Sequence, residues 1–227
     1  MNSMFWKRNK DTHTKARLNY ISSNRDKKEE LYKKITNKNS SAYLTLMSIV
    51  QGVALSYFAS HMDRSYQSFT FADYLLSISV FMILILTWFE YYMGGTMFIW
   101  VHRLMDSIIP FTLFVAEILL IRELGSNNSN WFYVMAFFCF GSIIAFKNMY
   151  HQAIVIKENK YMIDWLDKHL KIPFIYLVIS FVLFIGFGSF WSPDHHLLLS
   201  IITFFFVIGF GVRAVIYWEH VIRYTKS

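Results

Sequence analysis

Three acidic residues, Glu90, Asp106 and Glu117, lie within strongly apolar runs of this chain. Because a charge is costly in the hydrocarbon core of a membrane, an ionisable residue within a span is expected to face protein or water rather than lipid. Carboxylates in such positions can attract cations or carry protons. These three residues are therefore the first candidates for pore or gating groups.

The residues around Asp106 form a polar stripe if one helix continues through them. Each residue of an α-helix advances about 100° around the axis, so His102, Arg103 and Glu117 share one arc with Asp106. We expect this arc to face other helices or a pore, which adds His102 and Arg103 to the candidates. The alternative is structural, with Arg103 forming an ion pair with Asp106 and Glu117 paired locally.

The last apolar run carries a second group of ionisable residues. In the stretch R-A-V-I-Y-W-E-H, the side chains of Arg213, Tyr217 and His220 fall on one face of a helix. Arg213 and His220 are candidate pore or gating residues for this reason. In the alternative interpretation, Arg213 is a structural anchor that extends its guanidinium group toward the lipid headgroups at the end of its span.

The segment from Trp88 to Asp106 joins two apolar runs through the pair Gly94-Gly95. We expect it to be the inner end of a helical hairpin, in which the glycines supply the bend and Glu90 can pair with Arg103. The residues that follow the glycines are too apolar for a solvated loop, which indicates helices that extend past the bilayer. This segment is our candidate for the place where the N-terminal residues and a pore communicate.

Signals for catalysis or metal binding are weak. The chain contains no H-E-x-x-H or G-x-S-x-G motif, no Gly-rich phosphate loop and only one cysteine, Cys139. Asp194, His195 and His196 are consecutive, and adjacent side chains point apart on most backbones, so no metal site is expected there. We predict no catalytic residue and no cofactor. An enzyme is less favoured than a channel, although Glu90, Asp106 and Glu117 leave an intramembrane enzyme open.

The composition indicates which elements must position these residues. Hydrophobic residues make up 55% of the 227-residue chain and charged residues 16%, whereas soluble proteins have about 25% charged residues. Apolar runs long enough to cross a bilayer need about 20 residues. The sequence predicts an all-α integral membrane protein with six such spans, near 42–60, 73–93, 104–122, 131–149, 172–191 and 196–218.

The distribution of basic residues predicts the orientation of these spans. With the N-terminus in the cytosol, the inner side receives 20 of the 22 Lys and Arg residues, and the outer side receives only Arg64 and Arg122. Cytoplasmic loops of membrane proteins carry such an excess of Lys and Arg. We therefore expect a multi-pass protein of the inner (plasma) membrane with both termini in the cytosol.

Residues 1–41 form a polar arm that carries the whole net charge of +7. One interpretation is a basic tail that sets topology and contacts anionic lipid headgroups. The other is an anion-binding site for a nucleotide or nucleic acid, in which cations neutralise phosphates and aromatic rings stack on bases. The candidate ligand-binding residues in the arm are Trp6, Lys7, Arg8, Lys10, Lys15, Arg17, Arg25, Lys27, Lys28, Lys33 and Lys34.

The chain thus divides into the arm, 1–41, and a transmembrane bundle, 42–227. A short helix is expected within the arm, from about residue 24 to 36. The stretch I-D-W-L-D-K-H-L places its apolar residues on one helical face, which is typical of an amphipathic helix on a membrane surface, near 156–171.

Three functions are compatible with this organisation. The first is an oligomeric channel or membrane-permeabilising effector, in which acidic residues favour cations and the arm responds to an anionic cytosolic ligand. The second is a membrane-embedded enzyme or small transporter. The third is a membrane anchor that recruits a soluble partner through the arm. The expected partners are the lipid bilayer, further copies of the chain and a nucleotide or oligonucleotide.

A basic arm with the stretches K-R-N-K and D-K-K-E-E-L-Y-K-K, attached to a small aromatic-rich bundle, resembles bacterial anti-phage membrane effectors. In layout it is similar to the channel partner of the nucleotidyltransferase in the Hailong defence system. The resemblance lies in the general plan and covers no diagnostic motif. It implies a gate controlled by an oligonucleotide that a soluble partner enzyme makes.

Overall fold

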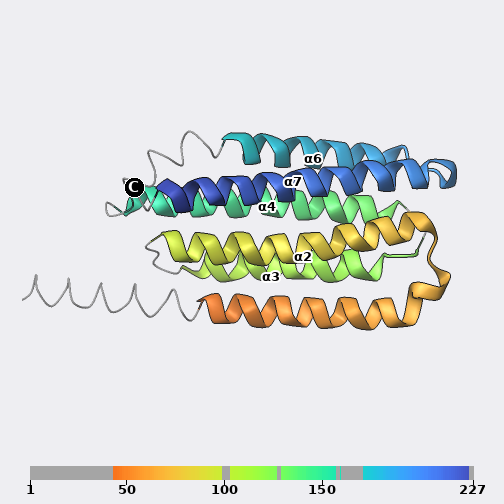
Figure 1. The fold of residues 1–227 in the computed structure, drawn as a ribbon, viewed down its shortest axis with the longest axis horizontal. Coiled ribbons are helices and arrows are strands. Elements are labelled where there is room, and N and C mark those ends of the chain that lie inside the picture. Colours follow the sequence, from red (N-terminus) through yellow and green to blue (C-terminus); the bar gives the residue numbers. More distant parts are fainter. Residues whose placement is uncertain (1–42, 99–102, 127–128, 157–158, 160–170, 225–227) are drawn as a thin grey trace, which may run out of the picture.

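The computed structural model describes residues 43–98, 103–126, 129–156, 159 and 171–224, and within them all regular structure is helical (Figure 1). The first helix covers residues 43–65 and leads into the 3-10 helix η1 (Tyr66–Ser68). The other elements are α2 (Phe71–Met97), α3 (Leu104–Arg122), α4 (Asn130–Val155), α6 (Lys171–Ser189), η3 (Pro193–His195) and α7 (His196–Tyr224).

Six of these helices are long and apolar enough to cross a membrane. Their candidate spans are Tyr43–Ser68, Phe71–Thr96, Leu104–Arg122, Asn130–Val155, Ile172–Ser189 and Pro193–His220. The prediction of an all-helical protein with six possible spans is thereby confirmed. The arm and most of the expected surface helix near 156–171 lie outside the described residues.

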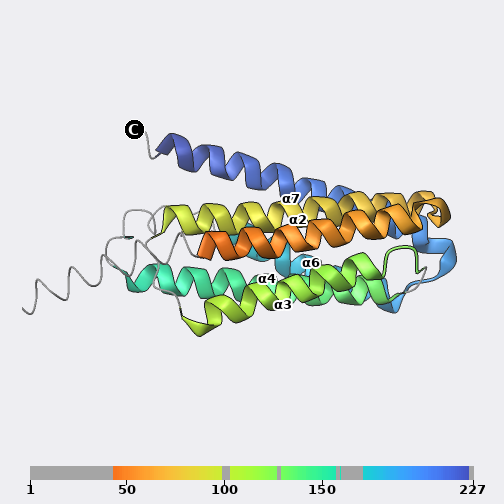
Figure 2. The same ribbon diagram turned by 90° about the horizontal axis from the view of Figure 1, so that it is seen from below.

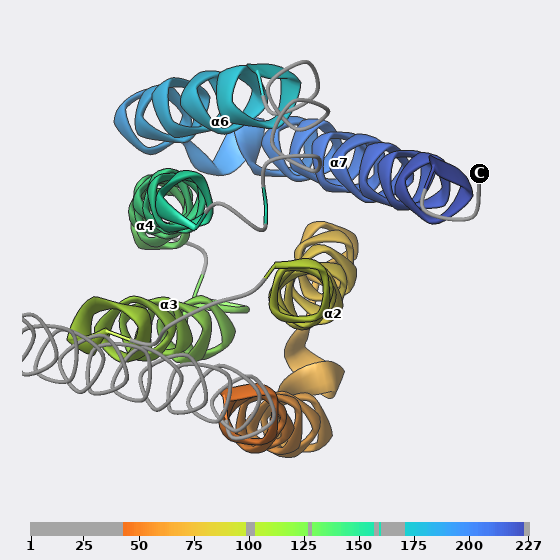
Figure 3. The same cartoon turned by 90° about the vertical axis from the view of Figure 1, so that its left-hand side faces the viewer.

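The six helices run in alternating directions around a common centre (Figures 1 and 3). Helix α4 packs along α3 and α6, and α2 packs along α7. Helix α7 is inclined to α2 (Figure 2), and it contacts its sequence neighbour α6 at only a few positions. We call the end at which α3 begins and α2 ends the Asp106 end of the bundle.

Two helix starts are set by acidic residues three positions inside them. At the start of α2, the Thr70 backbone N–H donates to Asp73 Oδ2 (2.8 Å), and the Asp73 backbone N–H donates to Thr70 Oγ1 (3.3 Å). This reciprocal arrangement is a capping box, which satisfies donors that the first helical turn leaves unpaired. At the start of α3, the Arg103 backbone N–H donates to Asp106 Oδ2 at 2.8 Å.

The start of α3 corrects the predicted polar stripe. Arg103 precedes the helix and has extended backbone angles, φ −115° and ψ 166°, so the rotation of about 100° per residue does not apply to it. Its side chain is exposed, and it contacts Asp106 through the backbone amide rather than as an ion pair. His102 lies outside the described residues.

Gly94 and Gly95 do not form the predicted bend, because α2 continues through them to Met97. A Cβ atom on Gly94 would lie 2.9 Å from Sδ of Met149 on α4, and one on Gly95 would lie 3.0 Å from Cδ2 of Leu44 on the first helix. The pair therefore allows two helices to approach α2 closely.

The distribution of side chains is reversed relative to a water-soluble protein. Glu117 and Asp106 expose 0% and 2% of their surface, whereas Ile175, Ile179 and Val182 of α6 expose 55%, 49% and 63%. An apolar exterior around buried polar groups suits a bundle surrounded by lipid.

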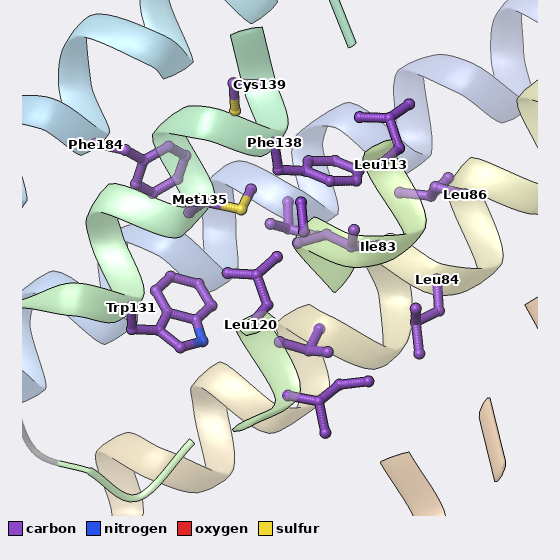
Figure 4. Packing of buried hydrophobic residues seen from close by; sticks show 14 of the residues in the cluster. Ile83, Leu84, Leu86, Leu113, Leu120, Trp131, Met135, Phe138, Cys139 and Phe184 are labelled. Atoms are coloured by element: carbon purple, nitrogen blue, oxygen red, sulfur yellow. The ribbon is translucent and has the colours of Figure 1, made fainter. Parts of the chain in front are cut away.

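Bulky side chains from several helices form the interior. Leu113 of α3, Met135 and Phe138 of α4, and Phe184 of α6 belong to one buried cluster (Figure 4). These side chains fix the relative positions of the helices that carry the polar residues.

Candidate functional site

Glu117 is the most deeply placed acidic residue. It lies on α3, thirteen residues from Leu104, which corresponds to a helical rise of about 20 Å, and it is fully buried. Gln51 of the first helix donates Nε2 to both carboxylate oxygens, at 3.2 and 3.0 Å. The Thr87 hydroxyl of α2 borders the same carboxylate. Glu117 thus joins three helices through neutral partners.

Asp106 is the second buried acidic residue, and it lies at the Asp106 end of the bundle. Besides the amide of Arg103, it receives hydrogen bonds from Asn148 Nδ2 (2.7 Å) and Gln152 Nε2, both on α4. Asn148 and Gln152 are four residues apart and therefore lie on the same face of α4. This arrangement joins the start of α3 to the last two turns of α4.

Tyr91 lies between the two acidic centres. Both Asp106 and Glu117 are close enough to Tyr91 to act on it electrostatically, and so is Tyr43. The Tyr43 and Tyr91 rings meet edge to face, with centroids 6.1 Å apart. The Tyr91 hydroxyl is buried and has no hydrogen-bond partner among the described residues.

Glu90 forms a third acidic position, one helical turn from Thr87 on α2. The charged group that acts on it is Arg213 of α7, and the buried Trp218 indole also borders it. Arg213 places its guanidinium carbon 5.1 Å from the centre of the Tyr217 ring, within the range of a cation–π interaction. The predicted Glu90–Arg103 pair is not formed.

A cavity of about 120 Å³ lies at the centre of the bundle, and residues from all six long helices line it. Along α4 its wall extends from Met135 to Met149, which corresponds to a rise of about 21 Å. The wall contains Glu90 and Asp106 but is otherwise largely apolar. The cavity is therefore narrow and elongated along the bundle.

The predicted site residues fall into three groups. Asp106 and Glu117 are buried, as the predicted arc required, and Glu90 and Asp106 border the same cavity. Arg213 is half-buried beside Glu90, whereas Arg103 and His220 are exposed. All the candidate anion-binding residues of the arm lie outside the described residues.

The consecutive residues Asp194, His195 and His196 have different surroundings in the structure. Asp194 and His195 are exposed, whereas His196 is buried, with Nε2 3.9 Å from Asp73 Oδ1. Among the described residues, no group of three or more His, Cys, Asp or Glu side chains could hold a metal ion.

The partners of the acidic residues were not among the sequence candidates. Gln51, Asn148 and Gln152 donate to the carboxylates, Tyr91 lies near both carboxylates, and Tyr43 lies near Asp106. An available signal was the presence of amide side chains in apolar runs, since buried amides need partners. Comparison with known proteins finds no matching family model, no matching curated protein and no matching solved structure.

Proposed function

We propose that the protein is a cation-conducting membrane channel or permeabilising effector whose opening depends on an anionic cytosolic ligand. The observation that supports this function best is the carboxylate of Glu117, which is fully buried within a candidate span and bonded to the neutral amide of Gln51. An ionisable residue within a membrane span, turned away from lipid, commonly marks the path of an ion or proton.

The proposed path runs along the interior of each chain. Glu117 lies deep in the bundle, and Glu90 and Asp106 border the cavity that extends toward the Asp106 end. Acidic groups inside a pore lower the energy of cations relative to anions. Since the cavity lies between six helices of one chain, assembly of several copies would multiply such paths rather than create one shared pore.

The structure we describe represents the closed state in this proposal. Bulky side chains such as Phe184 and Leu113 fill much of the centre, and the cavity is narrow. Opening therefore requires the helices to move apart, and a ligand achieves this only if it binds the open and closed states with different affinities.

The first helix is the proposed connection between ligand and gate. It directly follows the basic arm in sequence, and its residues Tyr43, Leu44 and Gln51 contact Tyr91, Gly95 and Glu117. A shift of this helix would change the surroundings of both buried carboxylates. We propose that the basic arm binds a nucleotide or oligonucleotide and displaces this helix.

A small transporter is the second candidate function, because the cavity within one chain could hold a solute. The two functions differ in kinetics. The flux through a channel continues to increase as the driving force increases and does not saturate at low ion concentrations. The rate of a transporter, in contrast, reaches a maximum when every binding site is filled.

The test is cation flux into liposomes that contain the purified full-length protein, followed with a voltage-sensitive dye. Flux is measured with and without a pool of short single-stranded oligonucleotides. We expect the oligonucleotides to start the flux, and Glu117→Gln to reduce it. Asp63→Asn, which removes an exposed carboxylate from the first helix, is the matched control.

Two results would contradict the proposal. The wild-type protein could fail to pass cations under all these conditions, including after removal of residues 1–41. Alternatively, Glu117→Gln could conduct as well as the Asp63→Asn control, which would assign Glu117 a structural role.

A further inference from the structure

The central cavity has a mainly apolar wall. Phe138, Phe184, Phe206 and Leu177 belong to it, among other apolar residues. Ligand sites in proteins typically have such an enclosure, together with a few polar groups that fix the orientation of the ligand. The chemistry of a ligand therefore depends on which polar groups of the wall are still available.

The hydroxyl groups of three wall residues are already bonded. Ser142, Ser180 and Thr87 each donate to the backbone carbonyl four residues earlier on their own helix. These residues therefore offer little to a polar ligand. Burial of apolar surface is the main gain that this part of the wall provides.

The acidic residues of the wall also have partners. Arg213 acts electrostatically on Glu90, so a guanidinium group already faces that carboxylate. Asp106 accepts hydrogen bonds from Asn148 and Gln152 as well as from a backbone amide. A charged ligand would lose its water in the cavity without a new ion pair to compensate for the loss, and an uncharged ligand is favoured for this reason.

Tyr91 differs from the other polar residues named above. It lines the cavity, and its hydroxyl oxygen is buried without a hydrogen-bond partner among the described residues. A buried polar group without a partner is unfavourable. Because a hydroxyl both donates and accepts, a hydroxyl or carbonyl oxygen of a ligand would provide the missing partner.

The dimensions of the cavity favour a chain over a ring. The volume is about 120 Å³, and the wall extends along α4 from Met135 to Met149, which corresponds to a rise of about 21 Å. An apolar cavity of about 150 Å³ holds benzene, so a hydrocarbon chain of about six carbons should fit this narrow and elongated space.

We propose that the central cavity binds an uncharged amphiphile with a short hydrocarbon chain and one hydroxyl or carbonyl oxygen. The oxygen bonds to the Tyr91 hydroxyl, and the chain extends along the apolar wall toward Phe184. Burial of the chain provides most of the affinity, and the hydrogen bond fixes its direction. This binding does not require that the protein conducts ions.

Cys139 provides a direct reporter of occupancy. It is the only cysteine of the chain, it is 2% exposed, and it lines the cavity. The full-length protein in diphytanoyl phosphatidylcholine nanodiscs is treated with the small neutral reagent methyl methanethiosulfonate, and modification is followed by mass spectrometry. The thermal unfolding midpoint is a second readout that does not depend on thiol reactivity.

The probes are n-hexanol, n-hexylammonium and n-hexanoate, which share a chain length and differ in charge. They are compared at equal concentrations in the bilayer. We expect n-hexanol to slow modification of Cys139 and to raise the unfolding midpoint. The two ions should have much weaker effects, because their charged groups would be buried without partners.

Two substitutions in the wall test where the probe binds. Ala145→Leu adds apolar volume to the wall and should remove the effect of n-hexanol on both readouts. Ala59→Leu, at an exposed position of the first helix, is the matched control and should retain the effect. Tyr91→Phe keeps the ring and removes the hydroxyl, so it should weaken n-hexanol binding about fivefold.

Several results would overturn the proposal. n-Hexanol could leave both readouts unchanged, either ion could act as strongly as n-hexanol, or folded Ala145→Leu could respond to n-hexanol as the control does. If Ala145→Leu fails to fold, Tyr91→Phe decides the test, because it adds no atom to the wall. Undiminished binding of n-hexanol to Tyr91→Phe would overturn the proposal as well.

A free compound and the acyl chain of a lipid share the proposed chemistry, and nanodisc composition distinguishes them. The methyl branches of diphytanoyl chains make them too wide for a narrow cavity, whereas unbranched chains can enter it. If a lipid chain is the occupant, dioleoyl phosphatidylcholine nanodiscs should protect Cys139 without any added probe. If the ligand is a free compound, the two lipids should give the same rate until n-hexanol is added.

Discussion

Gln51 of the first helix donates its amide to both carboxylate oxygens of Glu117 on α3, at 3.2 and 3.0 Å. The two residues are sixty-six positions apart in the chain, and both are almost completely buried. This contact binds the helix that follows the basic arm to the acidic centre of the bundle. It therefore has consequences for stability as well as for the proposed gate.

Replacement of Gln51 by Leu should destabilise the protein by about 1–3 kcal/mol, because it leaves a buried carboxylate without its donor. The double variant Gln51→Leu/Glu117→Leu should recover part of this loss, since it removes both partners. Chemical unfolding in detergent measures each free energy and completes a double-mutant cycle. Strict additivity of the two substitutions would show that the contact contributes nothing.

Gly94→Leu should destabilise the bundle by about 1–3 kcal/mol, because overfilled contacts force neighbouring groups apart, whereas Gly94→Ala should gain less stability than a Gly→Ala substitution in open space. The cause is the close approach of Met149, whose Sδ atom would lie 2.9 Å from a new Cβ atom. Gly52→Ala is the matched control, since nothing lies within 4 Å of its Cβ position. There the substitution should stabilise the helix by about 0.5–1 kcal/mol. Equal effects at both positions in thermal unfolding would contradict this account of the glycine pair.

Simultaneous replacement of Lys7, Arg8 and Lys10 by Gln should weaken binding of a labelled single-stranded oligonucleotide. If each cation neutralises one phosphate, the slope of log affinity against log salt should fall by about 2. Fluorescence anisotropy over a salt series measures this slope. Arg64→Gln, in an exposed residue at the other end of the first helix, is the control. An unchanged slope would favour the alternative in which the arm contacts lipid headgroups.

Orientation can be measured with single cysteines introduced into a Cys139→Ala background. Arg64 and His151 are both exposed, and they lie near the ends of the first helix and of α4, respectively. These two helices end at opposite ends of the bundle (Figure 1). Because most basic residues belong to the predicted inner side, we expect a membrane-impermeant maleimide to label Arg64→Cys in intact cells. His151→Cys should react only after the membrane is permeabilised. The opposite pattern would reverse the predicted topology.

Much of the architecture could be predicted because each span is a local property of the chain. A run of about 20 apolar residues can satisfy its backbone hydrogen bonds only by forming a helix within lipid. For the same reason, the burial of Asp106 and Glu117 followed from the cost of exposing a charge to lipid. Both inferences depend on neighbouring residues and not on distant ones.

The helix boundaries were less predictable. Gly94 and Gly95 suggest a bend, but in the structure they allow Met149 and Leu44 to approach α2. Likewise, the sequence predicts that Arg103 belongs to a helical stripe. In the structure, the backbone amide of Arg103 donates to the Asp106 side chain, and α3 begins after Arg103. The role of the glycine pair depends on side chains from two other helices, whereas the start of α3 is set by a local cap between residues three positions apart.

The sequence by itself determined the class of this protein, its six apolar helices and the need of its acidic residues to avoid lipid, since these depend on the transfer of each segment from water to hydrocarbon. Only the tertiary structure decided that Gln51 would bind Glu117, that Asn148 and Gln152 would bind Asp106, and that Arg213 would lie beside Glu90. Helix periodicity shows which face a residue occupies, but the choice of the facing helix depends on how side chains from all six helices pack together.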